Sequence, residues 1–416
     1  MIQYFKSLFF TDTGKDTSIV FIGTLINVTA GGLFFIFVPR ILGPSDYGLF
    51  STIVATGLMA ATIANFGIDT GILRFTHKDS DQSNAIFSLA LKSYLLSGLL
   101  IGVFGVLLAP ILANYLNHPE IMQLLRIAFA SIIFLLLTNF FVAALQSKKE
   151  FLKASIVNIS SNVARLAILV ISFFFLSIGL YFLTILFFFI TLVSVVVGKM
   201  YLSFRIVKTD KSLVKNYFKY NFWIAAALII SAIPFDNYFL LKLAGPVAAG
   251  LYAAPFKILT FSYQFGGNFT RVLASRFSSF DTNEKTILYA KKAAIIPVLL
   301  SLGLVFLVLF STPITLLLFG EKYQQASQIL QVLSIGFIFF FLSTIPSSII
   351  LYYFGKSSVS FGITLVRYFF FIALLLFLVP SQKAFGGAIA FSTSEFAAFL
   401  LMIGYMLLKF QKSDEY

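Results

Sequence analysis

Long uninterrupted apolar stretches constrain the fold of this chain more than any other feature of its sequence. The stretch SFFFLSIGLYFLTILFFFITLVSVVVG, from Ser172 to Gly198, contains no charged residue. A helix that crosses a bilayer needs about 20 apolar residues, whereas a membrane-spanning strand alternates polar and apolar residues. Hydrophobic residues make up 59% of the 416 positions and charged residues 11%, and the mean hydropathy is +0.96. The sequence therefore predicts an all-α polytopic membrane protein.

Charged residues, Pro-Gly turns and polar clusters divide the sequence into twelve predicted membrane-spanning helices. The weakest boundary lies between the fifth and sixth helices, where only Ser177 to Gly179 interrupts the apolar sequence. The predicted spans are roughly 18–38, 47–72, 85–112, 121–146, 155–177, 179–204, 218–242, 248–274, 286–318, 325–354, 358–379 and 384–408.

Lysine and arginine residues outside these spans fall mostly on one side of the predicted membrane. The alternate loops contain only Arg40, Lys242, Lys322 and Lys383. Because cytoplasmic loops carry an excess of basic residues, we expect both termini in the cytoplasm. The net charge of +14 then reflects topology and contact with membrane lipid, and we expect no nucleic-acid partner.

A repeated motif shows that the chain contains two copies of one unit. The segment RILGPSDYGLF, Arg40 to Phe50, is echoed 202 positions later by KLAGPVAAGLY, Lys242 to Tyr252. The same spacing relates Arg165 to Arg367. We therefore expect two pseudo-symmetric six-helix lobes, related by an axis along the membrane normal. The predicted organisation is an N-terminal lobe at 1–204, a basic cytoplasmic linker at 205–217 and a C-terminal lobe at 218–416.

The repeated motif also predicts a sharp reversal between antiparallel helices. Pro44 fixes its own φ and disfavours helical backbone at the residue before it. Gly43 and Gly48 tolerate backbone angles that a bulky side chain would resist.

Three segments carry a resemblance to a known family. They are Arg40 to Phe50, Asn65-Phe-Gly-Ile-Asp69, and Asp236 to Tyr252. Together they resemble the polysaccharide transporter family, whose best-known members are Wzx-type O-antigen flippases, within the superfamily of multidrug, oligosaccharidyl-lipid and polysaccharide exporters. The resemblance implies a MATE-like, V-shaped pair of lobes with a central cavity. It implies a bacterial inner-membrane protein whose cargo is an undecaprenyl-pyrophosphate-linked O-antigen or capsule repeat unit. The cargo would pass from the cytoplasmic to the outer leaflet. Other glycan-assembly proteins would be its partners.

Basic residues inside the spans are the candidate ligands of a pyrophosphate, because a charge in hydrocarbon requires a partner or a wet interior. Arg165 and Arg367 lie roughly 15 Å from the inner ends of their spans at about 1.5 Å per residue, too deep to reach water readily. Two guanidinium groups at these matching positions could grip phosphate oxygens. Lys257 follows Pro255, which could break its helix, and Arg126 lies near an outer helix end. Alternatively, each deep arginine pairs with an acid or with backbone carbonyls inside its own lobe.

Two buried acids are candidates for ion coupling by a proton or a sodium ion. Asp236 follows Pro234, which should disrupt the local helix, and Glu395 is flanked by serine and threonine. The alternative for Asp236 is a static ion pair with Lys257. The sequence contains no cysteine and two histidines in loops on opposite sides, so we expect no metal site and no other cofactor.

Three other functions fit an all-α membrane chain. A drug or cation antiporter would share the fold, but the intramembrane arginines favour an anionic cargo. A lipid II flippase usually has fourteen spans and cationic residues in its first helix, which the segment SIVFIGTLINVTAGGLFFIFV lacks. A membrane polysaccharide polymerase or glycosyltransferase would need a sizeable loop with paired carboxylates or arginines, and every predicted loop is short. We therefore expect a transporter and not an enzyme.

Overall fold

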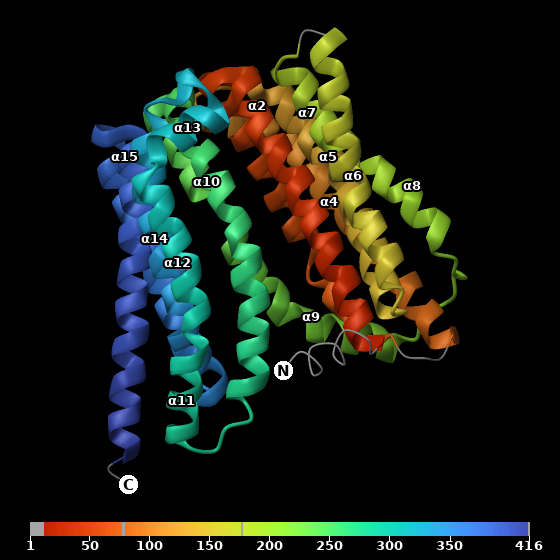
Figure 1. The fold of residues 1–416 in the computed structure, drawn as a ribbon. Coiled ribbons are helices and arrows are strands. Elements are labelled where there is room, and N and C mark those ends of the chain that lie inside the picture. The colour runs from red at the N-terminus through yellow and green to blue at the C-terminus, as the bar shows by residue number, and fades with distance from the viewer. Residues whose placement is uncertain (1–11, 77–79, 176–177, 415–416) are drawn as a thin grey trace. The chain divides into compact units, whose positions relative to one another are not determined.

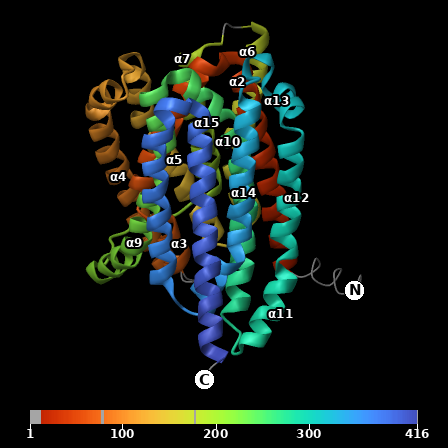
Figure 2. The ribbon, with the colours of Figure 1, turned by 90° about the vertical axis from the view of Figure 1, so that its left-hand side faces the viewer.

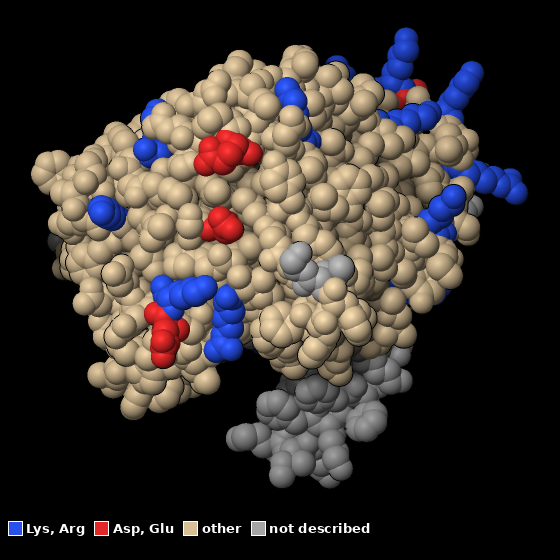
Figure 3. Space-filling model, turned by 90° about the horizontal axis from the view of Figure 1, so that it is seen from above, with Lys and Arg blue, Asp and Glu red and all other residues tan. Residues whose placement is uncertain are grey.

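The computed structural model describes residues 12–76, 80–175 and 178–414, and almost all of them are helical (Figure 1). Nine of the described helices are long and apolar enough to cross a membrane. Some exceed one crossing, since the first runs for 47 residues, Ile19–Asn65. Charged side chains are sparse on the face of the molecule in Figure 3. The all-α membrane fold predicted from the sequence is confirmed.

The described elements follow one another with short connections. They are α2 (Asp12–Asn65), α3 (Ile68–Phe75), α4 (Ser80–Tyr115), η1 (Pro119–Ile121), α5 (Met122–Ser147), α6 (Phe151–Phe175), α7 (Leu180–Phe189), α8 (Thr191–Tyr201), α9 (Lys211–Ala232), α10 (Phe235–Phe277), α11 (Asn283–Ala293), α12 (Ile295–Leu309), α13 (Ser311–Phe319), η2 (Glu321–Tyr323), α14 (Ala326–Ser348), η3 (Ile349–Tyr353) and α15 (Ser357–Asp414). The weakest predicted boundary lay between the fifth and sixth spans, at Ser177 to Gly179. Ser177 lies outside the described residues, and α7 begins directly after Gly179.

The chain divides into two compact units. Unit 1 comprises Met1–Phe34 and Leu49–Pro234, and unit 2 comprises Phe35–Gly48 and Phe235–Tyr416. These bounds differ from the predicted lobes in two places. The predicted linker and all of α9 group with unit 1, and the first repeated turn groups with unit 2.

The predicted linker is bound to unit 1 by specific hydrogen bonds. The backbone N–H of Arg205 donates to Asn84 Oδ1 at 3.2 Å, and that of Val207 donates to Ser88 Oγ at 3.0 Å. Both acceptors lie on α4. The Phe204 ring packs against α4 and α5 as well. The segment is therefore a strap on unit 1, a role that its basic composition did not predict.

One helix lies at the centre of each unit. In unit 1, α5 packs against α3, α4, α6, α7 and α8. In unit 2, α14 packs against α10, α12, α13 and α15, and Figure 2 shows α12, α14 and α15 side by side. These two helices begin shortly after matching 3₁₀ turns, Pro119–Ile121 and Glu321–Tyr323, which lie 202 positions apart. The repeat predicted from the sequence thus recurs in the backbone.

The repeated turns also have the same backbone conformation. Gly43 has φ 73° and ψ 172°, and Gly245 has φ 83° and ψ 174°. Each interrupts its helix at one residue only, and a proline begins the next helix. The predicted reversal is confirmed but is tighter than expected, since the predicted spans ended at 38 and resumed at 47. Positive φ at these positions favours glycine.

The two repeated turns cross each other within unit 2. A Cβ atom on Gly48 would overlap the carbonyl oxygen of Pro246, and a Cβ atom on Gly250 would overlap that of Pro44. This reciprocal contact explains why both copies of the motif have glycine four residues after the proline.

Prolines and glycines inside the spans break some helices and not others. α9 ends at Ala232 and α10 begins at Phe235, so Pro234 lies in a break as predicted. The break predicted at Pro255 is wrong, because α10 stays helical there. A proline can be accommodated where neighbouring groups compensate for the lost hydrogen bond. A break that we did not predict occurs at Gly67, with φ 69°, between α2 and α3.

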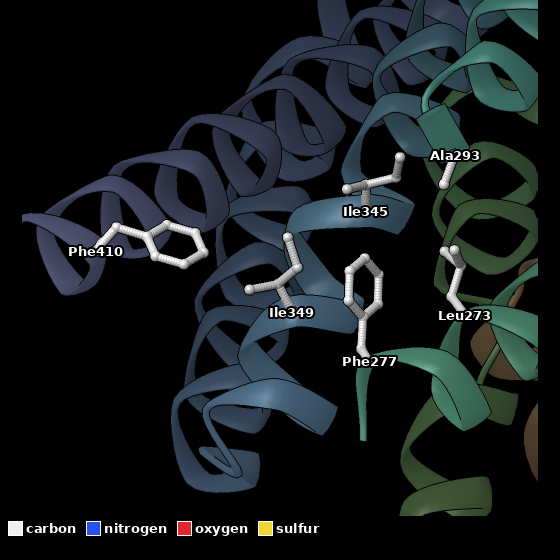
Figure 4. Close-up of a cluster of buried hydrophobic side chains, with 6 residues drawn as sticks. All are labelled: Leu273, Phe277, Ala293, Ile345, Ile349 and Phe410. Carbon is white, nitrogen blue, oxygen red and sulfur yellow. The ribbon is translucent and has the colours of Figure 1, made fainter. Parts of the chain in front are cut away.

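An apolar cluster holds one end of unit 2 together (Figure 4). Phe277 and Leu273 at the end of α10 are fully buried, and they meet Ile345 of α14 and Ile349 of η3. Phe410 of α15 and Ala293 of α11 complete the cluster. Burial of such side chains is typically worth about 1.5–3 kcal/mol each, so this cluster anchors α11 to the longer helices.

Candidate functional site

Arg165 is buried inside unit 1 without a carboxylate partner among the described residues. Its side chain is 5% exposed. Nη1 donates to Asn162 Oδ1 at 2.5 Å, and Nη2 donates to the carbonyl oxygen of Phe187 at 2.9 Å. In the part of the chain that the structure describes, Nε has no hydrogen-bond partner and no ion pair includes Arg165. The hydrogen-bond acceptors that the described part of unit 1 offers to this positive charge are therefore neutral groups.

Aromatic rings cover the guanidinium group of Arg165. Its Cζ lies 4.2 Å from the ring centroid of Phe187 and 5.5 Å from that of Phe34. Phe50 packs edge-on against Phe187. A cation over an aromatic face is stabilised by the ring quadrupole, most strongly when both are desolvated. The rings partly offset the cost of burying this arginine.

Asparagine side chains connect Arg165 to a more exposed part of unit 1. Asn162 lies one turn before Arg165 on α6, and its Nδ2 donates to Oδ1 of Asn27 on α2 at 2.7 Å. Both asparagines are partly exposed. Our sequence reasoning missed this pair. The spacing of three residues between Asn162 and Arg165 was the available signal, because it places them on one helix face.

Arg367, the matching arginine of unit 2, forms an ion pair with Glu395. Nη1 donates to Oε1 at 2.6 Å, and the side chains are 19% and 6% exposed. The guanidinium Cζ also lies 4.4 Å from the ring centroid of the neighbouring Tyr368. The sequence left two alternatives for this arginine, binding of cargo phosphate or a pair within its own lobe. The structure contains the pair within its own lobe. Arg367 is the more accessible member of the pair.

An aromatic cluster surrounds this ion pair. Tyr263 of α10 interacts electrostatically with both charged groups and packs edge-on against Phe340 at 4.3 Å between centroids. Phe256 packs against Phe391 at 5.3 Å. The cluster joins α10, α14 and α15 around one buried charge pair. Tyr263 was not among the residues that we predicted.

Asp236 is buried in unit 2 at the start of α10. It is 8% exposed, and its Oδ1 accepts from the backbone N–H of Asn237 at 2.9 Å. The Tyr252 side chain lies near this carboxyl group. The positions that match Asp236 and Tyr252 in unit 1 are Phe34 and Phe50, so the repeat has an acid and a phenol where the first copy has two apolar rings.

Lys257 and Arg126 have different environments from the deep arginines. Lys257 Nζ lies 4.5 Å from the ring centroid of Phe35 within unit 2. The described ion pairs do not include the alternative pair of Lys257 with Asp236. Arg126 lies in the first turns of α5, and its Nη1 donates to Gln123 Oε1 at 3.5 Å. Its position near a helix end allows the charged group to reach the membrane surface.

Sequence comparison connects the chain to proteins of polysaccharide biosynthesis. The profile of a family described as polysaccharide biosynthesis protein matches residues 13–280. A Shigella flexneri protein named as an O-antigen transporter is 26% identical over 392 residues, which cover 89% of this chain and 91% of that protein. The lipopolysaccharide biosynthesis protein WzxC of Escherichia coli strain K12 is 23% identical over 382 residues, covering 89% and 76% of the two chains.

Structural comparison finds the same fold in membrane transporters. The lipid II flippase MurJ in an inward closed conformation has a TM-score of 0.72 at 15% identity, with coverage of 94% of this chain and 87% of that one. An inward-facing multidrug resistance MATE family transporter has a TM-score of 0.67 at 14% identity, with coverage of 96% and 98%. The MATE-like fold predicted from the sequence is confirmed.

Proposed function

The chain belongs to the polysaccharide biosynthesis protein family, and on that basis we propose that it flips an undecaprenyl-pyrophosphate-linked oligosaccharide across a bacterial inner membrane. The oligosaccharide moves from the cytoplasmic to the outer leaflet by alternating access. The relatives named for O-antigen transport and lipopolysaccharide biosynthesis support this cargo class. The activity is transport and requires no covalent step. Both termini lie in the cytoplasm, and other glycan-assembly proteins deliver and receive the cargo.

The observation that carries this proposal is the charge of Arg165, which has no acid among its described partners. An isolated cation in a dry interior is costly, and a buried ion pair would normally form instead. Unit 1 retains the cation with asparagine, a backbone carbonyl and aromatic rings around it. A pyrophosphate would supply the missing negative charge and accept hydrogen bonds from the planar guanidinium. Asn162 and Asn27 offer further amide donors beside it.

Arg367 has a different role in the proposed cycle. Its charge is neutralised by Glu395, so it attracts an anion only when that carboxylate is protonated or displaced. Protonation of Glu395 therefore frees Arg367 for the anionic cargo, and loss of that proton restores the ion pair when the cargo leaves, which couples proton movement to transport. A sodium ion bound by Glu395 would release Arg367 in the same way. Asp236 is a second ion-coupling position, and Lys257 and Arg126 contribute further positive charge to cargo binding.

A drug antiporter is the second function that the fold allows. The MATE family transporter shares the architecture at 14% identity, a level at which only the fold carries over. The family match and the absence of Arg165 from the described ion pairs both favour an anionic cargo over a cationic drug.

Complementation of a bacterial strain that lacks its own flippase tests the proposal. The wild-type chain should restore surface glycan, and Arg165→Ala should not. Arg205→Ala is the matched control, because Arg205 is an exposed arginine on the strap of unit 1. Normal surface glycan with both Arg165 and Arg367 replaced by alanine would refute the proposal that these arginines bind the anionic cargo. Membrane levels of each variant, measured in parallel, separate lost transport from lost protein.

A further inference from the structure

α9 (Lys211–Ala232) is an amphipathic helix at the start of the second repeat. Lys211, Lys215 and Lys219 are exposed and lie four residues apart, so they occupy one face. Tyr217 and Asn221 are fully buried on the opposite face. The predicted span began at 218, but the helix begins seven residues earlier, and these additional residues carry two of the lysines.

The buried face fixes the rotation of α9 about its own axis. The Tyr217 hydroxyl donates to the backbone carbonyl of Ile68 at 2.6 Å, and its ring lies 5.6 Å from that of Phe75. Gly71 of α3 provides the space for this packing, because a Cβ there would lie 2.6 Å from both Tyr217 and Asn221. The three lysines therefore point away from unit 1 as a set.

The exposed face of α9 has a concentrated positive charge. None of the ion pairs among the described residues includes Lys211, Lys215 or Lys219. The acid nearest in sequence, Asp210, precedes the helix, and the Ser212 hydroxyl donates to it and lowers the pKa of its carboxyl group. Lys208 on the adjoining strap is exposed too.

The position of α9 matches an anionic membrane surface. In Figures 1 and 2, α9 lies obliquely across the lower end of unit 1. Tyr220 and Phe222, close to the last lysine, are 39% and 52% exposed. A helix with a basic face and exposed aromatic residues binds the headgroup region of a bilayer, where lysines attract anionic lipids.

We propose that the lysine face of α9, formed by Lys211, Lys215 and Lys219, binds phosphate groups of anionic phospholipids. That these lipids belong to the cytoplasmic leaflet rests on the orientation in the proposed function. Because α9 is the last helix of unit 1 before the chain enters unit 2 at Phe235, bound lipid would hold this end of unit 1 at the membrane surface. The binding itself requires no transported cargo.

The chain contains its own reporter for this interaction. Its single tryptophan, Trp223, lies one helical turn after Lys219. The purified protein would be placed in nanodiscs that contain equal fractions of phosphatidylglycerol and phosphatidylcholine, with one or the other lipid brominated on its acyl chains. Brominated phosphatidylglycerol should quench Trp223 more strongly, and the preference should fade at high salt because ions screen the attraction.

Two triple variants decide the outcome. Lys211→Gln, Lys215→Gln and Lys219→Gln together should remove the preference for phosphatidylglycerol. The control replaces Lys285, Lys291 and Lys292 of α11, which are exposed but lie in unit 2, and it should keep the preference. Equal quenching by both lipids in the wild type, or an unchanged preference in the α9 variant, would overturn the proposal. Neither outcome would bear on glycan flipping, which complementation measures separately.

Discussion

Arg165 and Arg367 occupy matching positions of the repeat, yet their surroundings are opposite. Arg165 is 5% exposed, lies between two phenylalanine rings and has no acid among its described partners. Arg367 is 19% exposed and holds Glu395 at 2.6 Å. The position that matches Glu395 in unit 1 is Val193. Among the described residues, Arg165 therefore has no acid to offset its charge, whereas the charges of Arg367 and Glu395 offset each other.

The difference shows what each copy of the repeat retains. The turns at Gly43 and Gly245 keep their backbone angles within about ten degrees, and the two 3₁₀ turns keep their spacing. Side chains at other matching positions have diverged: Phe34 in unit 1 corresponds to Asp236 in unit 2, and Val193 corresponds to Glu395. Backbone geometry is shared because both copies need the same helix reversals, while the chemistry of each buried site is free to differ.

Removing Arg367 should have the largest effect on stability. Arg367→Ala leaves Glu395 buried without its partner, and breaking a buried pair in this way costs about 3–5 kcal/mol. We expect a lower melting temperature in detergent and a reduced level in the membrane. Arg367→Ala combined with Glu395→Gln should restore most of the stability, because no buried charge remains. A single variant as stable as the wild type would contradict the ion pair.

Introducing an acid into unit 1 should convert its site toward that of unit 2. Val193 lies on α8 beside Ser194, which bonds to Ser160 and Ser161 of α6 near Arg165. Val193→Glu should pair with the arginine, leave the protein stable and reduce export by at least about tenfold, equivalent to roughly 1.4 kcal/mol. Val193→Gln is the uncharged control and should export normally. Full export by the Val193→Glu variant, at a normal membrane level, would show that the unpaired charge is unnecessary.

Neutralising Glu395 tests whether the pair in unit 2 opens during transport. Glu395→Gln keeps an oxygen that can accept from Arg367 but removes the exchangeable charge. We expect a folded protein whose remaining export no longer depends on the proton or sodium gradient. Collapsing each gradient separately in cells, with surface glycan as the readout, identifies the coupling ion. Export that depends on the gradient to the same extent as the wild type would exclude Glu395 as the coupling residue.

The smallest expected effect comes from the asparagine that supports Arg165. Asn162→Ala removes the hydrogen bond from Arg165 at 2.5 Å and the one to Asn27 at 2.7 Å. Loss of the bond that supports Arg165 is worth about 1 kcal/mol, or roughly fivefold in cargo affinity. Ser160→Ala, on the same helix but bonded to Ser194, is the control and should leave affinity unchanged. An equal loss in both variants would indicate a general disturbance of α6.

Much of the fold could be predicted from the sequence because hydrocarbon imposes strict local rules. Long apolar stretches predicted membrane-spanning helices, the repeat spacing predicted the two matching turns, and Pro234 predicted a break that the structure contains. Pro255 misled the prediction, because the sequence does not reveal which prolines are accommodated by packing. The grouping of the strap with unit 1 depends on hydrogen bonds to Asn84 and Ser88, residues that lie more than a hundred positions away.

The candidate site was predictable only in part. Depth in the membrane singled out Arg165 and Arg367 as unusual, and the repeat spacing paired them. Their partners depend on which helix faces meet, and the sequence does not encode that locally. Glu395 was expected to serve ion coupling without reference to Arg367, and Asp236 was considered with Lys257. In the structure, α15 is interrupted at the non-helical residue Lys383, and the part after this residue brings Glu395 to an arginine 28 positions earlier.

The binding of undecaprenyl pyrophosphate to the purified protein tests the central claim most directly. Wild-type protein and Arg205→Ala, the exposed control, should bind it equally. Arg165→Ala should lose at least about thirtyfold in affinity, since loss of a buried charged partner costs about 2 kcal/mol or more. Arg165→Lys should fall between them, because it retains the charge without the planar fork. Equal affinity of the wild type and Arg165→Ala would contradict the claim that the unpaired cation of unit 1 recognises the cargo.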